Sequence, residues 1–211
     1  MPDVNLRWLG LKAYEPIWRQ MQSYAATRDA NSPDEIWCLE HPPVYTQGAA
    51  GKEEHVLRRN AIPVVAVDRG GQVTYHGPGQ LMVYPLLDLK RHSLSIRDLV
   101  TALESAVVLT VATYGIHAIA KREAPGVYVE GKKLASIGLR VRRQSSYHGV
   151  SINVAMDLSP FDDINPCGYA GLAVTDLSQL GAVMTPRDFA IQMIPFLFNT
   201  LRLSLPVTWQ A

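Results

Sequence analysis

Cys167 lies between a proline and a glycine in the segment NPCG, residues 165–168 of this 211-residue chain. Proline and glycine so close together are typical of a turn. A thiol in a turn is usually reachable, whereas a structural cysteine packs in a strand or helix as a small hydrophobe. The chain's other cysteine, Cys38, stands between Trp37 and Leu39 and is predicted to pack in the core. Cys167 is therefore the candidate nucleophile.

A nucleophilic thiol needs a basic or cationic partner, because a free thiol with a pKa near ~8.5 is mostly protonated at neutral pH. The candidates are His76, His148, Lys132 and Lys133. A histidine at the start of a strand is more often structural, and lysines beside a turn usually face solvent. Sequence spacing does not choose among the four, since partners converge in space. The residues by themselves predict a cysteine acyl-transfer site with an open choice of partner.

The segment DRGGQVTYHGPGQ, residues 68–80, is dense in glycine. Glycine lets a backbone approach a ligand closely. The alternative interpretation is a pair of tight hairpin turns, and both remain open. A second segment, GKKLASIG at 131–138, brings two lysines into a strand that continues with small residues.

Several other chemistries are excluded by missing motifs. The chain has no GxxxxGK[ST] phosphate loop, and HGPGQL at 76–81 lacks the third glycine of a dinucleotide fingerprint. It has no HExxH, HxH or CxxC, so no metal site is expected. No other cofactor is expected either. The basic run RVRR at 140–143 is interpreted as a solvated strand edge, and the net charge of +1 does not favour nucleic acid as a partner.

The composition, 47% hydrophobic and 18% charged, is that of one globular domain, predicted to span residues 1–211. Two cysteines far apart in sequence form no disulfide framework, which favours a reducing compartment. The N-terminus has no signal pattern, and no run approaches the ~18 apolar residues of a membrane-spanning helix. We expect a cytoplasmic protein.

Strands and helices interleave along the chain, and hairpins among them predict an α+β fold with a mixed sheet packed with helices. Helices are expected over 14–27, after the cap Ser95, and after the cap Thr185. The buried face of the second helix is predicted to comprise Ile96, Leu99, Val100, Leu103, Val107 and Val111. Strands are expected at 34–41, ended by two prolines, in a strand–turn–strand–turn–strand series over 62–89, in a hairpin turning at Glu130–Gly131, and at 147–158.

Three segments, in this order, resemble the lipoyl(octanoyl)transferases, the octanoyl-[acyl carrier protein]:protein N-octanoyltransferases. They are RGGQVTYHGPGQLMVYPLLDLKR, GVYVEGKKLASIGLRVRR and HGVSINVAMDLSPFDDINPCGYAG, within a matching region of about 40–176. The resemblance implies a fold shared with biotin and lipoate protein ligases. It also implies transfer of an octanoyl group to the target lysine of lipoyl domains.

The same resemblance assigns residues. Cys167 matches the acyl-thioester nucleophile, and Lys133 matches the lysine that stabilises the thiolate. The positions that match substrate-binding segments are Arg69, Gly70, Gly71, Gln72, Val73, Thr74, Tyr75, His76, Ser136, Ile137, Gly138, Gly149, Val150 and Ser151.

The implied donor is octanoyl-acyl carrier protein, and the implied acceptors are lipoyl domains of 2-oxoacid dehydrogenase complexes and the glycine cleavage H protein. Because the donor is already a thioester, no ATP is needed, in agreement with the missing phosphate loop. A monomer is expected, without nucleic acid or membrane as partner. Since acyl carrier proteins are acidic, Arg140, Arg142 and Arg143 are predicted to form a basic docking surface.

Two alternatives remain open. An ATP-dependent lipoate or biotin protein ligase on the same fold would activate a free acid as an adenylate and would not need the thiol of Cys167. An inactive module that binds acyl carrier or lipoyl domains would bind without turnover. The requirement for ATP separates the first alternative from the transferase, and turnover separates the second.

Overall fold

The structure is a computed structural model that describes residues 4–204 and 209–210. Its elements, with η marking short 3-10 helices, are β1 (Val4–Leu11), α1 (Tyr14–Thr27), β2 (Asp34–Glu40), β3 (Val44–Gln47), η1 (Glu53–His55), β4 (Val64–Ala66), β5 (Val73–His76), β6 (Gln80–Leu86), α2 (Ile96–Ala112), β7 (Ile119–Ala120), β8 (Gly126–Val129), β9 (Lys132–Arg142), β10 (Ser145–Asn153), η2 (Ser159–Asp163), η3 (Pro166–Gly168), α3 (Pro186–Leu201) and β11 (Trp209–Gln210). The single-domain prediction also includes residues 1–3, 205–208 and 211, which lie outside the described residues.

A mixed sheet forms the middle of the molecule. Within the described residues it has eight strands in the order β11-β1-β2-β6-β10-β9-β8-β7. β1 pairs in parallel with β2 and β11, and the remaining pairs are antiparallel. The predicted α+β class with a mixed sheet is confirmed.

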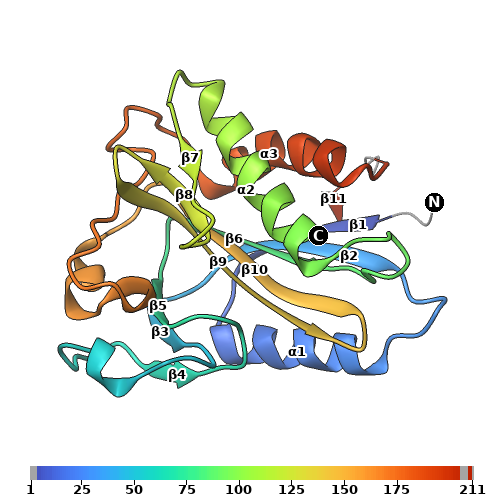
Figure 1. Cartoon of the computed structure of the whole chain (residues 1–211), viewed down its shortest axis with the longest axis horizontal. Helices are drawn as coiled ribbons and strands as arrows, with labels where there is room; N and C mark the ends of the chain where they lie inside the picture. The colour runs from blue at the N-terminus through green and yellow to red at the C-terminus, as the bar shows by residue number, and fades with distance from the viewer. Residues whose placement is uncertain (1–3, 205–208, 211) are drawn as a thin grey trace.

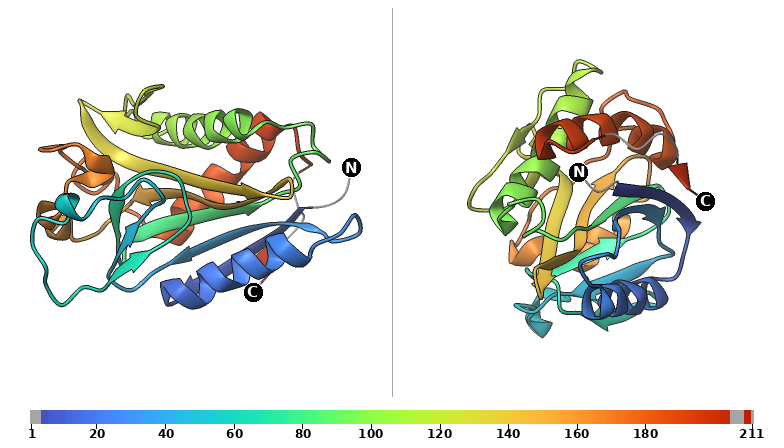
Figure 2. Two further views of the ribbon diagram at one scale, coloured as in Figure 1. Left: turned by 60° about the horizontal axis from the view of Figure 1, so that its bottom comes forward. Right: turned by 90° about the vertical axis from the view of Figure 1, so that its right-hand side faces the viewer.

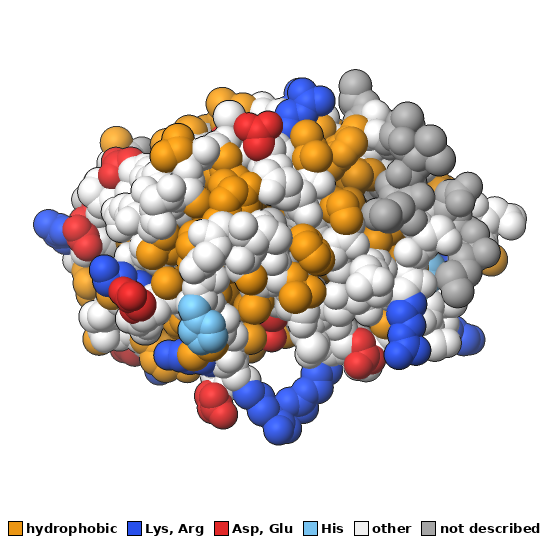
Figure 3. Space-filling model, turned by 90° about the horizontal axis from the view of Figure 1, so that it is seen from above, with side chains coloured by type: hydrophobic (Ala, Val, Ile, Leu, Met, Phe, Trp, Pro, Cys, Tyr) orange, Lys and Arg blue, Asp and Glu red, His pale blue; other side chains and the backbone are white. Residues whose placement is uncertain are grey.

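Helices cover both faces of this sheet, α1 on one side and α2 with α3 on the other (Figures 1 and 2). The α1 helix packs Ile17, Met21 and Ala25 against Met82 and Tyr84 of β6. The larger apolar core lies under α2 and α3 and includes Cys38, which is fully buried as predicted. Hydrophobic side chains also gather on the outer side of these two helices (Figure 3).

The predicted helix caps are confirmed. The Ser95 hydroxyl accepts from the amide of Asp98, whose carboxylate accepts from the amide of Ser95, and Thr185 and Asp188 do the same for α3. The placement of Ile96 on the buried face of α2 is wrong, since this first residue after the cap is 47% exposed.

The three strands expected over 62–89 are present as β4, β5 and β6, but they do not pair with one another as two consecutive hairpins. β4 and β5 belong to a small separate sheet of order β4-β3-β5, whereas β6 belongs to the main sheet. In the small sheet, β3 lies between β4 and β5 and pairs in parallel with β4 and antiparallel with β5. The turn around Gly71 therefore connects β4 to β5, the two strands on either side of β3. The turn around Gly79 connects β5 of the small sheet to β6 of the main sheet.

The β8–β9 hairpin turns at Glu130–Gly131 as predicted, with φ of 49° and 82°. At the other end of β9, a turn at Arg143–Gln144 leads into β10, and Arg142 and Arg143 are exposed there. Arg142 is nine residues from Lys133, or roughly 30 Å at ~3.3 Å per residue. The predicted basic surface thus lies at the opposite end of the strand from Lys133.

Candidate active site

Cys167 is the middle residue of η3 and has a left-handed backbone, with φ 57° and ψ 16°. This conformation is uncommon for a residue with a side chain. Gly168 follows with φ 80°, and Pro166 anchors the turn in the protein. The thiol is half-buried rather than open to solvent and lines a pocket.

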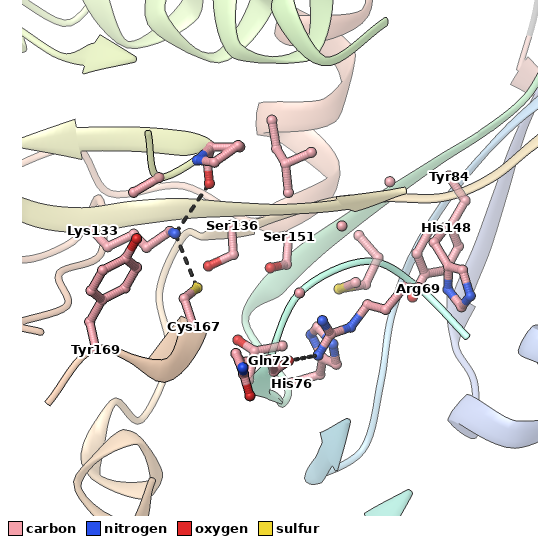
Figure 4. A pocket seen from close by; sticks show the side chains of 18 of the residues that line it. Arg69, Gln72, His76, Tyr84, Lys133, Ser136, His148, Ser151, Cys167 and Tyr169 are labelled. Carbon is pink, nitrogen blue, oxygen red and sulfur yellow. Dashed lines mark hydrogen bonds between the residues drawn. The ribbon is translucent and has the colours of Figure 1, made fainter. Parts of the chain in front are cut away.

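Lys133 is the candidate partner that the structure brings to Cys167. Its Nζ lies 3.1 Å from Sγ of Cys167 and 3.2 Å from the carbonyl oxygen of Pro125 (Figure 4). Lys133 is buried, whereas Lys132 is exposed. A register shift lets β9 turn Lys133 inward: Tyr128 pairs with Lys133 but Val127 pairs with Ala135, so one extra residue of β9 is accommodated between them.

The surroundings of Lys133 oppose one another in their effect on its charge. Burial lowers the pKa of the Lys133 ammonium, but the facing Cys167 sulfur and Tyr128 raise it more, so the pKa lies above its ordinary value. The Tyr128 ring centroid is 5.2 Å from Nζ. The geometry therefore suits an ammonium beside a thiolate, and the ammonium depends on that sulfur for part of its stability.

His76 and His148 lie at the other end of the pocket from Cys167 (Figure 4). His148 is 2.9 Å through Nε2 from a carboxylate oxygen of Asp68. His76 contacts Gln80 at 2.7 Å and Thr46 at 3.1 Å. Burial lowers the pKa of both rings, which keeps them neutral near pH 7. Both histidines are held in buried hydrogen-bond networks, and neither contacts the thiol among the described contacts.

The pocket, of about 170 Å³, runs across three neighbouring strands. Because strand side chains alternate between faces, every second residue faces the same side of the sheet. Ser151 of β10 pairs with Ser136 of β9, and Gly149 pairs with Gly138. These small residues lie in the middle of the pocket wall, while larger side chains of β6 close one end.

Arg69 fixes the wall opposite the sheet. Its guanidinium is buried and donates to the carbonyl oxygens of Thr46 at 2.6 Å, Gly70 at 2.9 Å and Gln72 at 2.8 Å. The amide of Gly70 in turn donates to the carbonyl of Leu139 in β9 at 3.1 Å. The φ of 90° at Gly71 favours glycine in this turn, and the approach of this backbone to a ligand stays a prediction.

Most of the predicted substrate-binding residues line this pocket, namely Arg69, Gly71, Gln72, Thr74, His76, Ser136, Ile137, Gly138, Gly149 and Ser151. Gly70, Val73, Tyr75 and Val150 do not. Val73 and Tyr75 pack against Phe161, and Val150 lies in the core on the α2 side. A continuous sequence motif therefore includes residues on both faces of a strand, and only those on one face line the pocket.

Sequence reasoning missed other pocket residues: Tyr14, Met82, Tyr84, Glu123, Ala124, Pro125 and Tyr169, together with His148, which was considered only as a partner for the thiol. The two-residue spacing of Met82 and Tyr84 in a predicted strand was a usable signal for one shared face. No sequence pattern indicated that residues 123–125 line the pocket, because their position depends on how this connection folds back onto Lys133.

Among the described residues, no group of three or more histidine, cysteine, aspartate or glutamate side chains is arranged to hold a metal ion. None of the described helices is long and apolar enough to cross a membrane.

Comparisons with known proteins identify the family to which the chain belongs. The structure of lipoate-protein ligase A bound with ATP superimposes with a TM-score of 0.77 over 99% of this chain and 90% of that one, at 14% identity, a likeness in fold. The family model of the lipoyl protein ligase A/B catalytic domain matches residues 13–197. The chain belongs to this family.

Curated relatives are considerably more similar in sequence. A protein of Laribacter hongkongensis named octanoyltransferase is 54% identical over 198 residues, which cover 94% of this chain and 96% of that protein. One of Pseudoalteromonas atlantica with the same name is 61% identical over 178 residues, covering 84% and 82%.

Proposed function

We propose that this chain is an octanoyltransferase that moves an octanoyl group from octanoyl-acyl carrier protein to the target lysine of a lipoyl domain, through a thioester on Cys167. The observation that carries the proposal is the 3.1 Å contact between Cys167 Sγ and Lys133 Nζ at one end of a pocket. The names of the curated relatives support the reaction class.

In the first half-reaction the Cys167 thiolate attacks the carbonyl carbon of the donor thioester. The new C–S bond forms as the bond to the carrier sulfur breaks, and the Lys133 ammonium gives its proton to the departing carrier thiolate. The products are an acyl-enzyme, a free carrier thiol and a neutral Lys133. Loss of the thiolate removes the main influence that raises the Lys133 pKa, while burial, which lowers it, remains.

In the second half-reaction the acceptor amine attacks the acyl-enzyme. Neutral Lys133 takes a proton from the amine as the amide C–N bond forms, and Cys167 leaves as the thiolate. The ammonium–thiolate pair is thereby restored. A thioester becomes an amide, so the step runs downhill without ATP.

The acyl chain occupies the pocket from Cys167 past Ser136 and Ser151 toward Tyr84 (Figure 4). The polar groups at the far end have their own partners: the Tyr84 hydroxyl lies 2.8 Å from His41, whose pKa burial lowers to about 4. The Tyr84 hydroxyl at this end is thus already paired within the protein. Each buried methylene contributes about 0.8 kcal/mol, which favours a medium-length chain over a short one.

The acceptors in this proposal are lipoyl domains of 2-oxoacid dehydrogenase complexes and the glycine cleavage H protein. The enzyme acts in the cytoplasm as a monomer, with no cofactor.

Intact-protein mass spectrometry tests the proposal. The wild type, mixed with octanoyl-acyl carrier protein without ATP, is expected to gain one octanoyl group that neutral hydroxylamine removes and that an added lipoyl domain accepts. Cys167→Ala is the control and is expected to gain nothing. Transfer that requires ATP and leaves no acyl-enzyme would favour the ligase alternative, and carrier binding without transfer would favour the inactive module.

A further inference from the structure

Glu104 is a carboxylate on the buried side of α2, between Leu103 and Ala106, both of which belong to the apolar core. A carboxylate among apolar groups is costly unless a specific partner compensates it. Burial raises the pKa of Glu104, while the amide of Gly126 and the charge of Lys133 lower it, with a net rise. The mechanism above makes no use of this group.

The partner of Glu104 is the backbone that supports Lys133. The amide of Gly126 donates to Oε1 of Glu104 at 2.8 Å. The carbonyl oxygen of the preceding residue, Pro125, is the one that accepts from Lys133 Nζ. A single peptide unit, Pro125–Gly126, thus has its N–H on Glu104 and its C=O on Lys133.

The Lys133 side chain runs directly over Gly126. A Cβ at position 126 would lie 2.8 Å from Cε and 3.3 Å from Nζ of Lys133, and the φ of Gly126 is 141°. Only glycine fits at position 126 without strain, because the aliphatic part of the Lys133 side chain packs directly against this backbone. A shift of the 124–126 segment would shift the ammonium with it.

We propose that Glu104 is a positioning residue for Lys133: it anchors the Pro125–Gly126 peptide whose carbonyl orients the ammonium toward Cys167. The inference rests on the Cys167–Lys133 pair of the proposed function. It extends that pair to a third residue, on α2, which does not line the pocket.

Other titratable groups lie around the pair. They are Lys121, whose Nζ is 4.4 Å from the Tyr128 ring centroid, Tyr128 itself, Glu123 and Tyr169 at the pocket wall, and Arg69, which interacts with the charge of Cys167. The substitutions below leave all of these groups in place.

The test is the pH–rate profile of Cys167 alkylation by iodoacetamide, read by peptide mass spectrometry, which requires no acyl transfer. Glu104→Met fills the same space without an acceptor. It is expected to slow alkylation at pH 7 at least fivefold and to move the midpoint of the profile to higher pH. Glu104→Gln retains an oxygen acceptor for the Gly126 amide and is expected to stay within twofold of the wild type.

Two controls separate positioning from general destabilisation. Asp98→Asn removes the carboxylate of the α2 cap and is expected to lower the melting temperature without moving the profile. In a Lys133→Met background, Glu104→Met is expected to add no further change, because the lysine through which Glu104 acts is absent.

An unchanged profile in Glu104→Met, an equal loss in Glu104→Gln, or an undiminished effect without Lys133 would each overturn the positioning role. Because alkylation reads the thiol directly, a failure of octanoyl transfer in the mass-spectrometric experiment would leave this result independent.

Discussion

Ser151 illustrates how single residues shape the pocket by being small. It is buried, lies between the two ends of the pocket and pairs across the sheet with Ser136. Neither hydroxyl is needed to explain the sulfur–lysine pair. The space in front of these serines is what an extended acyl chain would fill.

Ser151→Leu is expected to block the pocket beyond the first few carbons of an acyl chain. Octanoyl transfer would lose the burial of about four methylenes, which at about 0.8 kcal/mol each corresponds to roughly a 200-fold lower kcat/KM. Butyryl transfer would change much less. The measurement is kcat/KM with butyryl and octanoyl donors.

The matched control is Ser151→Ala, which removes the hydroxyl without adding bulk and should keep the wild-type preference. If Ser151→Leu lowers transfer of both acyl groups equally, the chain lies elsewhere.

At the scale of elements, the turn that carries Cys167 is held by a segment distant in sequence. We name residues 53–60, which include η1, the clamp segment. The amide of Asn165 donates to the carbonyl of His55 at 2.8 Å, and the amide of Leu57 donates to the carbonyl of Asp163 at 2.8 Å. The Asp163 carboxylate also binds Arg58 at 2.7 Å and Asn60 at 2.6 Å. These contacts fix the residues just before Cys167.

Asp163→Ala is expected to loosen the clamp segment and lower transfer activity several-fold. The Arg58 side chain is 68% exposed, so the ion pair itself contributes little, about 0–1 kcal/mol, and the melting temperature should change slightly. Hydrogen exchange should quicken at the amides of Leu57 and Asn165.

Asp162→Ala, a change of the same charge at the exposed neighbouring residue, serves as the control. Unchanged exchange at both amides in Asp163→Ala would show that the carboxylate does not hold the clamp segment.

Sequence patterns predicted elements well where a local signal was complete. The spacing over 14–27 and the capping residues Ser95 and Thr185 marked the helices because period and cap act within one element. The partition of β4, β5 and β6 between two sheets was not predictable, since alternation in a strand does not tell which strand pairs with it. β1, at the start of the described residues, was also missed, because its alternation is weak and most of it is half-buried.

The residues of the candidate site, too, were predictable only where the signal was local in sequence. Local pattern marked Cys167 as a thiol in a turn, but its partner came from a family resemblance, because Lys133 reaches it across 34 positions through a register shift in β9. The connection 123–125 and Glu104 were beyond prediction, since their contacts with Lys133 depend on tertiary folding alone.

At the scale of the whole molecule, Asp34 ties several elements together. Its fully buried carboxylate contacts Arg28 after α1 at 2.6 Å, Arg91 at 3.1 Å and His92 at 2.6 Å, and accepts from the amide of Asp88 at 2.7 Å. It thereby joins α1, the first residue of β2 and the connection between β6 and α2.

Stability is expected to fall in acid through Asp34. Burial raises its pKa, but His92, Arg28 and the amide of Asp88 lower it more, to about 2 from an ordinary 3.8. The unfolded chain then binds more protons between about pH 4 and pH 2, so the contribution is present above pH 4 and lost as the pH falls through 2. Its size is on the order of 2 kcal/mol.

Urea unfolding of the wild type and Asp34→Asn, from pH 7 to pH 2.5, checks this. The variant is expected to be less stable at pH 7 by about 3–5 kcal/mol, since it leaves buried cations without a counter-charge. The difference should shrink as the pH falls below 4. A constant difference across the range would assign the acid sensitivity to other carboxylates.

The burial of Cys38 has a consequence for oxidative damage. Cys167 is the thiol that lines the pocket, and the only other cysteine of the chain is sealed in the core under α2 and α3. A thiolate oxidised to the sulfenic acid is protected from further oxidation when a neighbouring thiol condenses with it to form a disulfide. This fold supplies no such resolving thiol. Recovery of an oxidised Cys167 therefore depends on a reductant from outside the chain, and under the proposed mechanism the transfer activity depends on that reductant as well.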